Sequence, residues 1–418
     1  MTKRAAHAGL LLAFISIAAV PVRAADWPQF RGPARDGISR ETGLLKQWPA
    51  GGPKVLWSIP VGQGYAGAAI VAGRVYHHDY DEAKGEWGIF CRNLTTGKEL
   101  WRFTEAKKIR PNHAITRTVP AVDGRFVISL DPKCGVHGLD AKTGKQVWSK
   151  DLVATYKTKI PPWYNGQNPL LEPDRIVIAT GGDAILVALD KATGKEIWRT
   201  PNTLNVIMSH ASVMPATLGG VKQYLYSTLD GIYGIAAKDG KLLWSYARKF
   251  NVAAVPSPLA VDGERVFVTG PYDAGSIMLR VRASGGVFKA EPDFDMKNAE
   301  WNSEVHTPIL FQNHMFAVGK KKRGLFTCLD LQGKTVWDSD GKASYELGNF
   351  ILADGAFFVL DGRTGMLRML EANITGYKEL ASTQVLSGND VWGPMALSDG
   401  KLVLRDLSKM VAMDVRGK

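Results

Sequence analysis

Polar and aromatic residues gather ahead of a proline that recurs six times along the chain. The prolines are Pro120, Pro169, Pro215, Pro258, Pro308 and Pro394. The residues that stand ahead of them are His113, Arg117, Trp163, Asn165, Gln167, His210, Ser212, Asn251, Trp301, Glu304, His306, Asn349, Asn389, Asp390 and Trp392. If successive repeats bring these segments together, their side chains converge in one concavity, which is the usual arrangement of a ligand site. Alternatively, they hydrogen-bond one another around a water-filled channel.

A repeat sets the register of these residues. Residues 139–148 read Leu-Asp-Ala-Lys-Thr-Gly-Lys-Gln-Val-Trp, and residues 189–198 read almost the same. Weaker copies end at Trp101, Trp244 and Trp337, and a worn copy occupies residues 283–289. The steps between these tryptophans are 47, 50, 46 and 93 residues, the last being two periods. Self-similarity at this period indicates a propeller or a solenoid.

The chemistry of the motif favours strands. Short apolar runs precede each Asp, as in residues 184–189. The Asp-x-x-Thr-Gly-Lys segment is turn chemistry, because Asp bonds its own backbone ahead and Gly tolerates a positive φ. The strand that follows carries a Trp on one face. Each unit is therefore predicted to be a hairpin whose indole docks on its neighbour.

The two ends of the repeat array predict a closed ring. Residues 54–57, Lys-Val-Leu-Trp, match the second half of the motif, and residues 413–418 match the first half. An N-terminal strand would then complete the last blade, as ring closure requires. The predicted outer-strand positions are Trp57, Trp101, Trp148, Trp198, Trp244, Lys289, Trp337 and Leu380. We expect an all-β, eight-bladed propeller of four-stranded antiparallel blades, in which the six tryptophans are structural docking residues.

The chain divides into three segments. Residues 1–24 have the charged start, short apolar run and small residues of a secretory signal peptide. Residues 25–53 form a strap rich in Gly and Pro, which we expect to lie across the outside of the first blades. Residues 54–418 form the propeller. We expect a periplasmic or extracellular protein without a lipobox cysteine, and without a transmembrane segment after signal cleavage.

Composition argues against several classes of protein. The formal net charge of +12 becomes +9 once Lys3, Arg4 and Arg23 are removed (12 − 3), and the basic residues are scattered. The run at 320–323 is predicted to be a solvated hairpin tip, so no nucleic-acid binding is expected.

Cys91, Cys134 and Cys328 form no disulfide framework or metal spacing, and their pairing is left open. His77 and His78 are predicted to be surface residues whose rings point to opposite faces of a strand.

The Asp-x-x-Thr-Gly-Lys-x-x-Trp repeat resembles that of the pyrroloquinoline quinone (PQQ) propellers. This family includes bacterial quinoprotein alcohol dehydrogenases and BamB-type scaffolds, and the resemblance covers residues 54–418. The chain is also similar to exported PQQ-like proteins that open with Trp-Pro-x-Phe-Arg-Gly-Pro, here Trp27 to Pro33. Enzymes and non-enzymes share the fold, so the resemblance alone does not set the function.

The resemblance implies two possible functions. One is a PQQ- and calcium-dependent alcohol or sugar dehydrogenase, with Asp390 as base and with Glu304, Asn349 and Asn389 as calcium ligands. Its cofactor site at the funnel mouth would consist of Arg117, Trp163, Trp301, Trp392, His113, His210 and His306. The other is a monomeric, non-catalytic binding or scaffold protein, with a protein or peptide partner at the loop face or a small molecule in the funnel. We favour the second, because the adjacent cysteine pair, the haem motif and the long inserted loops of the family's enzymes are absent.

Overall fold

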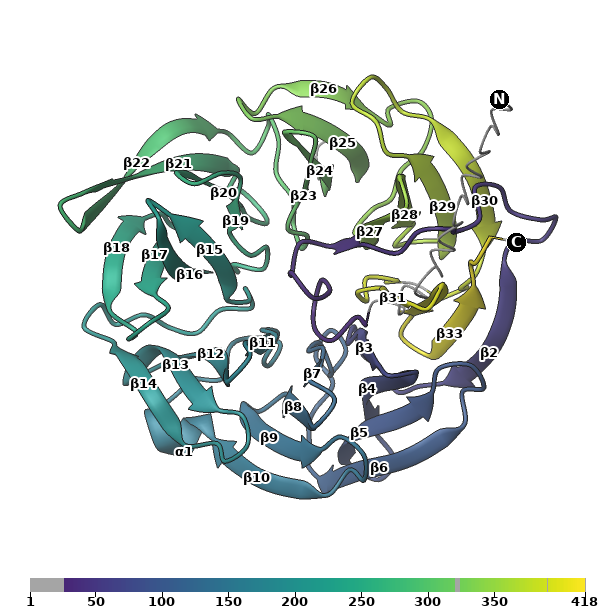
Figure 1. The fold of residues 1–418 in the computed structure, drawn as a ribbon, viewed down its shortest axis with the longest axis horizontal. Coiled ribbons are helices and arrows are strands. Elements are labelled where there is room, and N and C mark those ends of the chain that lie inside the picture. The colour runs from purple at the N-terminus through teal and green to yellow at the C-terminus, as the bar shows by residue number, and fades with distance from the viewer. Residues whose placement is uncertain (1–25, 320–323, 389, 418) are drawn as a thin grey trace, which may run out of the picture.

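The computed structural model describes residues 26–319, 324–388 and 390–417, and these form a ring of eight β-sheets around a central axis (Figure 1). The predicted signal peptide and the basic run at 320–323 lie outside the described residues. No helix within the described residues is long and apolar enough to cross a membrane. The eight-bladed, all-β prediction is confirmed.

Each of the first four blades is an antiparallel sheet that follows chain order from the axis outward. Their strands are β3 (Ala68–Val71), β4 (Arg74–Asp81), β5 (Glu86–Asn93) and β6 (Glu99–Ala106) in blade 1; β7 (Ala121–Val122), β8 (Phe126–Leu130), β9 (Gly135–Asp140) and β10 (Gln146–Asp151) in blade 2; β11 (Leu170–Leu171), β12 (Arg175–Gly181), β13 (Ala184–Asp190) and β14 (Glu196–Pro201) in blade 3; and β15 (Met214–Leu218), β16 (Val221–Ser227), β17 (Gly231–Ala236) and β18 (Leu242–Ala247) in blade 4. A short helix, α1 (Leu152–Tyr156), follows blade 2 and is capped by Asp151.

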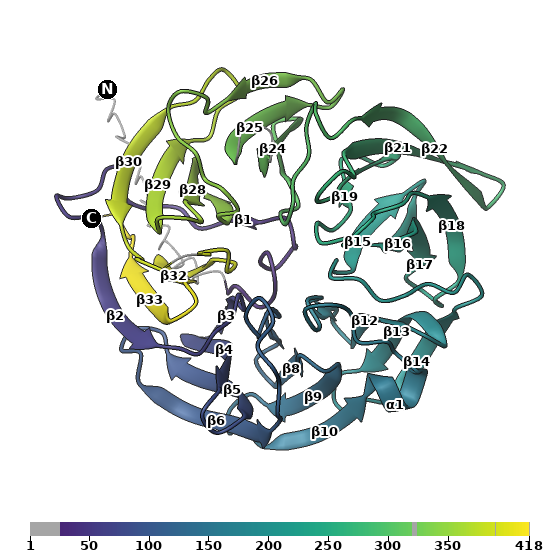
Figure 2. The same ribbon diagram turned by 180° about the vertical axis from the view of Figure 1, so that it is seen from behind.

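The remaining blades continue the ring (Figure 2). Their strands are β19 (Leu259–Ala260), β20 (Arg265–Thr269), β21 (Ser276–Ser284) and β22 (Val287–Met296) in blade 5; β23 (Ile309–Phe311), β24 (His314–Gly319), β25 (Leu325–Asp330) and β26 (Thr335–Asp338) in blade 6; β27 (Phe350–Ala353), β28 (Ala356–Leu360), β29 (Met366–Glu371) and β30 (Glu379–Gln384) in blade 7; and β31 (Ala396–Ser398), β32 (Lys401–Arg405), β33 (Lys409–Asp414) and β2 (Lys54–Pro60) in blade 8. Blade 7 gains a fifth, parallel strand, β1 (Ile38–Ser39).

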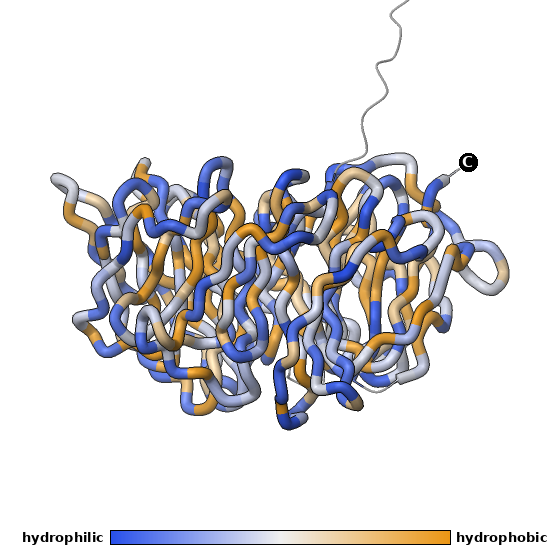
Figure 3. The backbone as a smooth tube through the Cα atoms, turned by 90° about the horizontal axis from the view of Figure 1, so that it is seen from below, coloured by the Kyte–Doolittle hydropathy of each residue, from blue (hydrophilic) through white to orange (hydrophobic). Residues whose placement is uncertain are grey.

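The ring closes as predicted. The N-terminal strand β2 pairs antiparallel with β33, and Trp57 lies opposite Ala412. The hydrophobic clusters lie between neighbouring blades; one of them joins blades 7, 8 and 1. Seen from the side, many hydrophobic stretches run through the body of the ring, between loops at its two ends (Figure 3). Closure therefore pairs the strand edge that would otherwise remain open.

The repeat motif folds by the turn chemistry that its residues predict. The Asp140 carboxylate accepts hydrogen bonds from the backbone N–H groups of Lys142 and Thr143, at 3.1 and 2.8 Å. Gly144 then adopts a φ of +75°, in the left-handed region that favours glycine. The same bonds recur at Asp190 in blade 3. In blades 2 and 3 these contacts end the third strand and start the outermost strand.

Every outermost strand carries a β-bulge immediately before the position of the motif tryptophan. In blade 2, Trp148 lies opposite Gly138 and Gln146 opposite Leu139, which leaves Val147 as the extra residue. The same shift in blades 5 and 7 places Phe294 and Ala381 at the tryptophan position. The predicted positions Lys289 and Leu380 lie in the correct strands but in the wrong register. The error arose because blade 5 has a longer terminal hairpin and Leu380 is itself the bulge residue.

The N-terminal strap does not lie outside the first blades, contrary to the prediction. Trp27 forms a β-bridge with Ile70 in blade 1, and the chain then crosses the central opening to reach blade 7 (Figure 1). Arg31 donates hydrogen bonds to the carbonyls of Thr307 and Pro308 beside blade 6, at 2.7 and 2.9 Å. The strap thus spans the axis, because its aromatic and arginine side chains find partners there.

His77 and His78 are buried in β4, so the prediction that they are surface residues was wrong. Their rings pack separately: His77 stacks on Phe90, and His78 packs edge-on against Trp87. Burial lowers the pKa of each imidazole to about 3, which keeps both neutral. They are core residues with hydrogen-bond partners.

Candidate functional site

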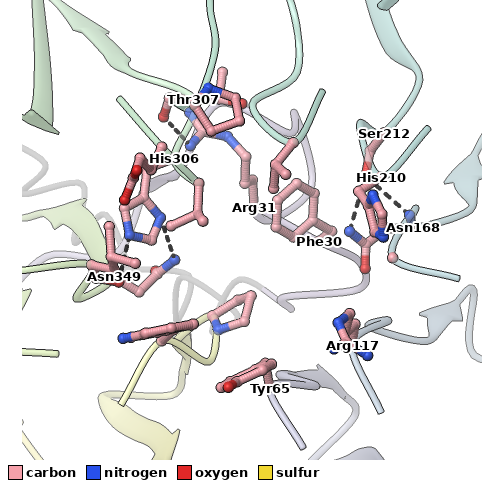
Figure 4. Close-up of a pocket in the computed structure, with 18 of the residues that line it drawn as sticks. Phe30, Arg31, Tyr65, Arg117, Asn168, His210, Ser212, His306, Thr307 and Asn349 are labelled. Carbon is pink, nitrogen blue, oxygen red and sulfur yellow. Dashed lines mark hydrogen bonds between the residues drawn. The ribbon is translucent and has the colours of Figure 1, made fainter. Parts of the chain in front are cut away.

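A cavity of about 400 Å³ lies on the propeller axis (Figure 4). Its walls come from the loops that precede the innermost strands, and the strap also lines it through Trp27, Phe30 and Arg31. Nine of the residues that stand ahead of the recurring prolines line it: His113, Arg117, Trp163, His210, Ser212, Glu304, His306, Asn349 and Trp392. The repeat thus brings together residues that lie far apart in sequence.

Two of the predicted site residues, Trp301 and Asp390, do not line the cavity. Trp301 is buried against Phe267, with ring centroids 6.1 Å apart, and does not line the cavity. The carboxylate of Asp390 accepts a hydrogen bond from the Tyr65 hydroxyl at 3.4 Å, just behind the cavity wall. Asn389 lies outside the described residues. The cavity wall therefore contains neither the Trp301 ring, which was expected to stack on a cofactor, nor the Asp390 carboxylate, which was expected to act as a base.

A belt of hydrogen bonds links the loops of blades 2 to 6 around the axis. The Val119 N–H donates to the Asn168 amide oxygen at 2.6 Å, and the Asn168 N–H donates to the Ser212 hydroxyl at 3.0 Å. The Ser212 N–H donates to Ser257 Oγ at 2.9 Å, and the Ser257 N–H donates to Thr307 Oγ1 at 2.8 Å. Each of these residues stands two positions before its innermost strand. These polar side chains therefore hold neighbouring blades together.

An aromatic and cationic group forms another part of the wall. The rings of Tyr65 and Trp392 stack with centroids 4.9 Å apart and planes 14° apart. The Arg117 guanidinium lies 5.7 Å from the centre of the Tyr65 ring, within the range of a cation–π contact. Burial lowers the pKa of Arg117 to about 10, so it remains protonated at neutral pH. Figure 4 shows Arg117 and Tyr65 side by side below the centre of the cavity.

Two histidines line the cavity in their neutral form. His306 donates its Nε2–H to the carbonyl of Leu347 at 2.8 Å, and burial lowers its pKa to about 4. Burial, reinforced by the charge of Arg117, also lowers the pKa of His210 to about 4. His210 Nε2 is buried without a hydrogen-bond partner among the described residues. Such a group is a candidate contact for a bound molecule.

Several residues of the cavity loops have strained backbones. His113, Trp163 and Asp390 have φ values of +49°, +61° and +57°. Non-glycine residues with such values are uncommon, and they concentrate at functional sites where the surrounding structure holds them in place. Similar φ values occur at Ala72 and Asn313 in hairpin turns, so they do not by themselves mark the candidate site.

The contributors to the cavity that the sequence interpretation missed include Tyr65, Phe30 and Arg31. The loop of blade 1 carries Gly67 instead of a proline, because a Cβ there would lie 2.6 Å from the Pro394 carbonyl. Counting back from the start of each innermost strand would have found Tyr65. Nothing in the strap sequence indicates that Phe30 and Arg31 reach the axis.

Trp57, Trp101, Trp148 and Trp198 pack against the turn glycine of the following blade. The indole N–H of Trp244 donates instead to the Gln223 side chain of its own blade, at 2.8 Å. The indole N–H of Trp101 donates to the Ala141 carbonyl at 3.1 Å, and that of Trp148 donates to the Lys191 carbonyl at 3.0 Å. A Cβ on Gly144 would lie 2.4 Å from the Trp101 ring. Trp57, Trp198 and Trp244 are buried, and Trp337 is half-buried. Phe294 takes the same place against Gly333 in blade 6.

The donor set of the cavity suits an anion better than a metal ion. Among the described lining residues, Glu304 is the single carboxylate, whereas Arg31 and Arg117 supply two guanidinium groups. The amide oxygen of Asn349 faces the Met395 N–H at 3.5 Å. No cluster of three or more His, Cys, Asp or Glu residues with metal-binding geometry occurs in the described part of the chain. Ca²⁺ requires six to eight oxygen ligands, so these residues do not fit the expected calcium site.

Comparison with known proteins agrees with the fold. The sequence model of the family described as outer membrane protein assembly factor BamB matches residues 38–159 and 88–339. The structure resembles BamB from Moraxella catarrhalis, with a TM-score of 0.59, 14% identity, and coverage of 86% of this chain and 97% of that one. It also resembles the quinohemoprotein alcohol dehydrogenase ADHIIG of Pseudomonas putida HK5, with a TM-score of 0.63, 11% identity, and coverage of 94% and 81%. At these identities the likeness shows the fold alone.

One curated relative matches over a shorter stretch. It is a tetrathionate hydrolase of Acidithiobacillus ferrooxidans, 26% identical over 172 residues, which are 38% of this chain and 31% of the relative. The chain thus spans about a third of that protein's length. The family match, over residues 38–159 and 88–339, extends over most of the ring. The chain therefore belongs to the PQQ-like β-propeller family described by the BamB model.

Proposed function

We propose that this protein is an exported, non-catalytic binding or scaffold protein that holds a ligand or partner at the mouth of its central cavity. The observation that carries the proposal is the lining of the cavity. Indole, phenol, imidazole and guanidinium groups converge there with one carboxylate among the described lining residues. Convergent polar groups in a mostly apolar cavity are typical of ligand binding. The belt of Asn168, Ser212 and Thr307 holds the wall rigid.

The geometry does not favour catalysis. Asp390 is directed to Tyr65, and two of the three histidines that line the wall, His210 and His306, are neutral at physiological pH. His210 and His306 are therefore poor general bases near pH 7, because efficient catalysis needs a pKa near the working pH. A scaffold role is consistent with the family's BamB description. Export is supported by the signal-peptide pattern of residues 1–24.

The alternative is a quinone-dependent dehydrogenase. A planar, carboxylate-bearing quinone such as PQQ matches the indoles and Arg117 in shape and charge, whereas its calcium does not match the donor set. The test is dye reduction by the purified mature protein with PQQ and Ca²⁺, using alcohols and sugars as substrates. We expect no turnover. Turnover that is lost in Asp390→Ala and in Glu304→Ala would overturn the non-catalytic proposal.

The binding role has its own test. Native mass spectrometry of the mature protein, purified from the periplasmic fraction, should show a retained small molecule or a stoichiometric partner. N-terminal sequencing of the same material should find a new terminus near residue 25. A full-length cytoplasmic protein that retains neither would refute the proposal.

A further inference from the structure

The belt of hydrogen bonds around the axis spans only part of the ring. It starts at the Val119 N–H of blade 2 and ends at the Thr307 hydroxyl of blade 6. The belt position, two residues before the innermost strand, is occupied in blades 7, 8 and 1 by Gly348, Pro394 and Ala66. The side chains of these three residues can neither donate nor accept a hydrogen bond. The belt therefore cannot continue through blades 7, 8 and 1, which we call the closure sector because strands from both ends of the chain meet in blade 8.

The strap reaches the closure sector from the inside of the ring. Its strand β1 pairs in parallel with β27, the innermost strand of blade 7. The Glu41 carboxylate accepts hydrogen bonds from the N–H groups of Asp399 and Gly400 in blade 8, at 2.6 and 2.8 Å. In blade 1, Trp27 and Ile70 exchange two backbone hydrogen bonds, both of 2.8 Å. The strap thus bonds to each of the three blades in which the belt position lacks a polar side chain.

The strap is also bonded to the first and last acceptor residues of the belt. Arg31 donates to the backbone carbonyl of Thr307 beside blade 6, at 2.7 Å. Arg35 donates to the backbone carbonyls of Asn168 and Pro169 beside blade 3, at 3.3 and 2.8 Å. These two arginines therefore connect opposite sides of the ring across the axis, along the path of the strap in Figure 1. Together, the belt and the strap form a continuous circuit of hydrogen bonds around the inner wall.

Both arginines are charged when they make these bonds. Burial lowers the pKa of Arg31 to about 10, and the charge of Asp36 opposes that shift. Burial, reinforced by the charge of Arg31, lowers the pKa of Arg35 to about 9. The two guanidiniums therefore remain protonated at neutral pH. Hydrogen bonds from a charged donor are stronger than those between neutral groups, so the bonds to the belt are strong ones.

The strap and β2 follow one another in the chain, so a single N-terminal segment closes the ring at two levels. At the outer rim of blade 8, β2 pairs with β33. At the inner wall, the strap joins blades 7, 8 and 1. Arg405 adds a link inside the closure sector, because it donates from blade 8 to the Gly62 carbonyl ahead of blade 1, at 2.7 Å. Phe30 and Arg31 of the strap also line the cavity.

We propose that the strap is an inner latch that completes the belt across the closure sector. Its release would loosen blades 7, 8 and 1 and open the cavity wall in the same step, while the belt would still hold blades 3 to 5. This inference goes beyond the proposed binding function, because it concerns where the ring opens and not what the cavity holds.

The test is hydrogen exchange of the purified mature protein, measured by mass spectrometry of its peptides in Arg31→Gln and in the unmodified protein. Exchange reports local opening separately for each blade. Loss of the charged donor should raise exchange in β27, β31 and β3 by about tenfold, and should change β15 to β17 of blade 4 by less than about twofold. An equal rise in all blades would overturn the latch, because the strap would then stabilise the ring as a whole. An unchanged closure sector would overturn it as well.

Arg40→Gln is the matched control. Arg40 is an exposed arginine of the same strap that pairs with Asp36 at 2.8 Å. Exposed ion pairs contribute little to stability, so exchange should stay unchanged in every blade. A rise in the closure sector as large as that of Arg31→Gln would overturn the role given to the bonds with the belt.

Two further variants decide the matter if Arg31→Gln does not fold. Glu41→Ala removes the acceptor of two N–H groups in blade 8 and should raise exchange in β31 but not in blade 4. Ser257→Ala interrupts the belt and should have the opposite effect, loosening blades 4 and 5 more than blades 8 and 1. If Glu41→Ala leaves β31 unchanged, or if Ser257→Ala loosens both sectors equally, the strap is not a separate latch and the inference is overturned.

Discussion

Replacing Gly144 by alanine tests how the motif tryptophan joins two blades. A Cβ at this position would lie 2.4 Å from Trp101 Cε3, closer than real Cβ atoms come to another atom. The residue also has a φ of +75°, which costs an L-residue about 1–2 kcal/mol. Displacing the packed indole adds roughly 1–3 kcal/mol. We therefore expect Gly144→Ala to lower the free energy of unfolding by about 2–5 kcal/mol.

The chain offers a matched control for this substitution. Gly220 has the same φ of +75° but no atom within 4 Å of its Cβ position, so Gly220→Ala should cost only the backbone strain, about 1–2 kcal/mol. Urea unfolding followed by fluorescence and by circular dichroism measures both values and checks that the two transitions coincide. Combining Gly144→Ala with Trp101→Leu should recover part of the loss. Equal losses in the two glycine variants would refute indole docking as the reason for glycine in the motif.

Three further outcomes follow from the structure. Ser257→Ala leaves the buried N–H of Ser212 without its acceptor and should cost about 1–3 kcal/mol, whereas the exposed Ser284→Ala should change the urea midpoint little. The three buried cysteines, whose pKa values are raised by burial, should react with a thiol reagent at pH 8 only after denaturation. The pKa of His77 and of His78 is about 3 in the fold, against 6.5 ordinarily, so stability should fall as the pH drops from about 6.5 towards 3. His77→Gln should reduce the change in urea midpoint between pH 7.5 and pH 5. An undiminished change would contradict the conclusion that protonation of His77 destabilises the fold.

Much of the ring could be predicted from short stretches of sequence. The Asp, Thr and Gly of the motif bond within one turn, so Asp140 and Gly144 determine a hairpin wherever they stand. The matching half-motifs at residues 54–57 and 413–418 predicted ring closure, and β2 pairs with β33 accordingly. Blade 5 shows the limit of this approach. Its hairpin is longer than the motif, so Phe294 rather than Lys289 faces the next blade.

The candidate site could be predicted from the sequence less completely than the ring, because its geometry depends on the tertiary structure. The spacing of the funnel residues placed nine of them at one end of the axis, because the period and the ring together determine where each loop lies. Whether a polar side chain faces the cavity or joins the neighbouring blade could not be predicted. The Ser212 hydroxyl lines the cavity and also accepts a hydrogen bond from the Asn168 amide, 44 residues away, whereas the Asp390 carboxylate accepts one from Tyr65, 325 residues away.

The sequence by itself determined the local hairpins, their number and the closure of the ring. Only the tertiary structure decided that the strap crosses the axis and that Arg31 lies in the cavity. The physical reason is the range of the interactions. A turn forms from side chains and backbone within a few residues, whereas two of the carbonyls that bind Arg31, those of Thr307 and Pro308, are more than 270 residues away. Those carbonyls reach their positions beside Arg31 only after all eight blades have packed.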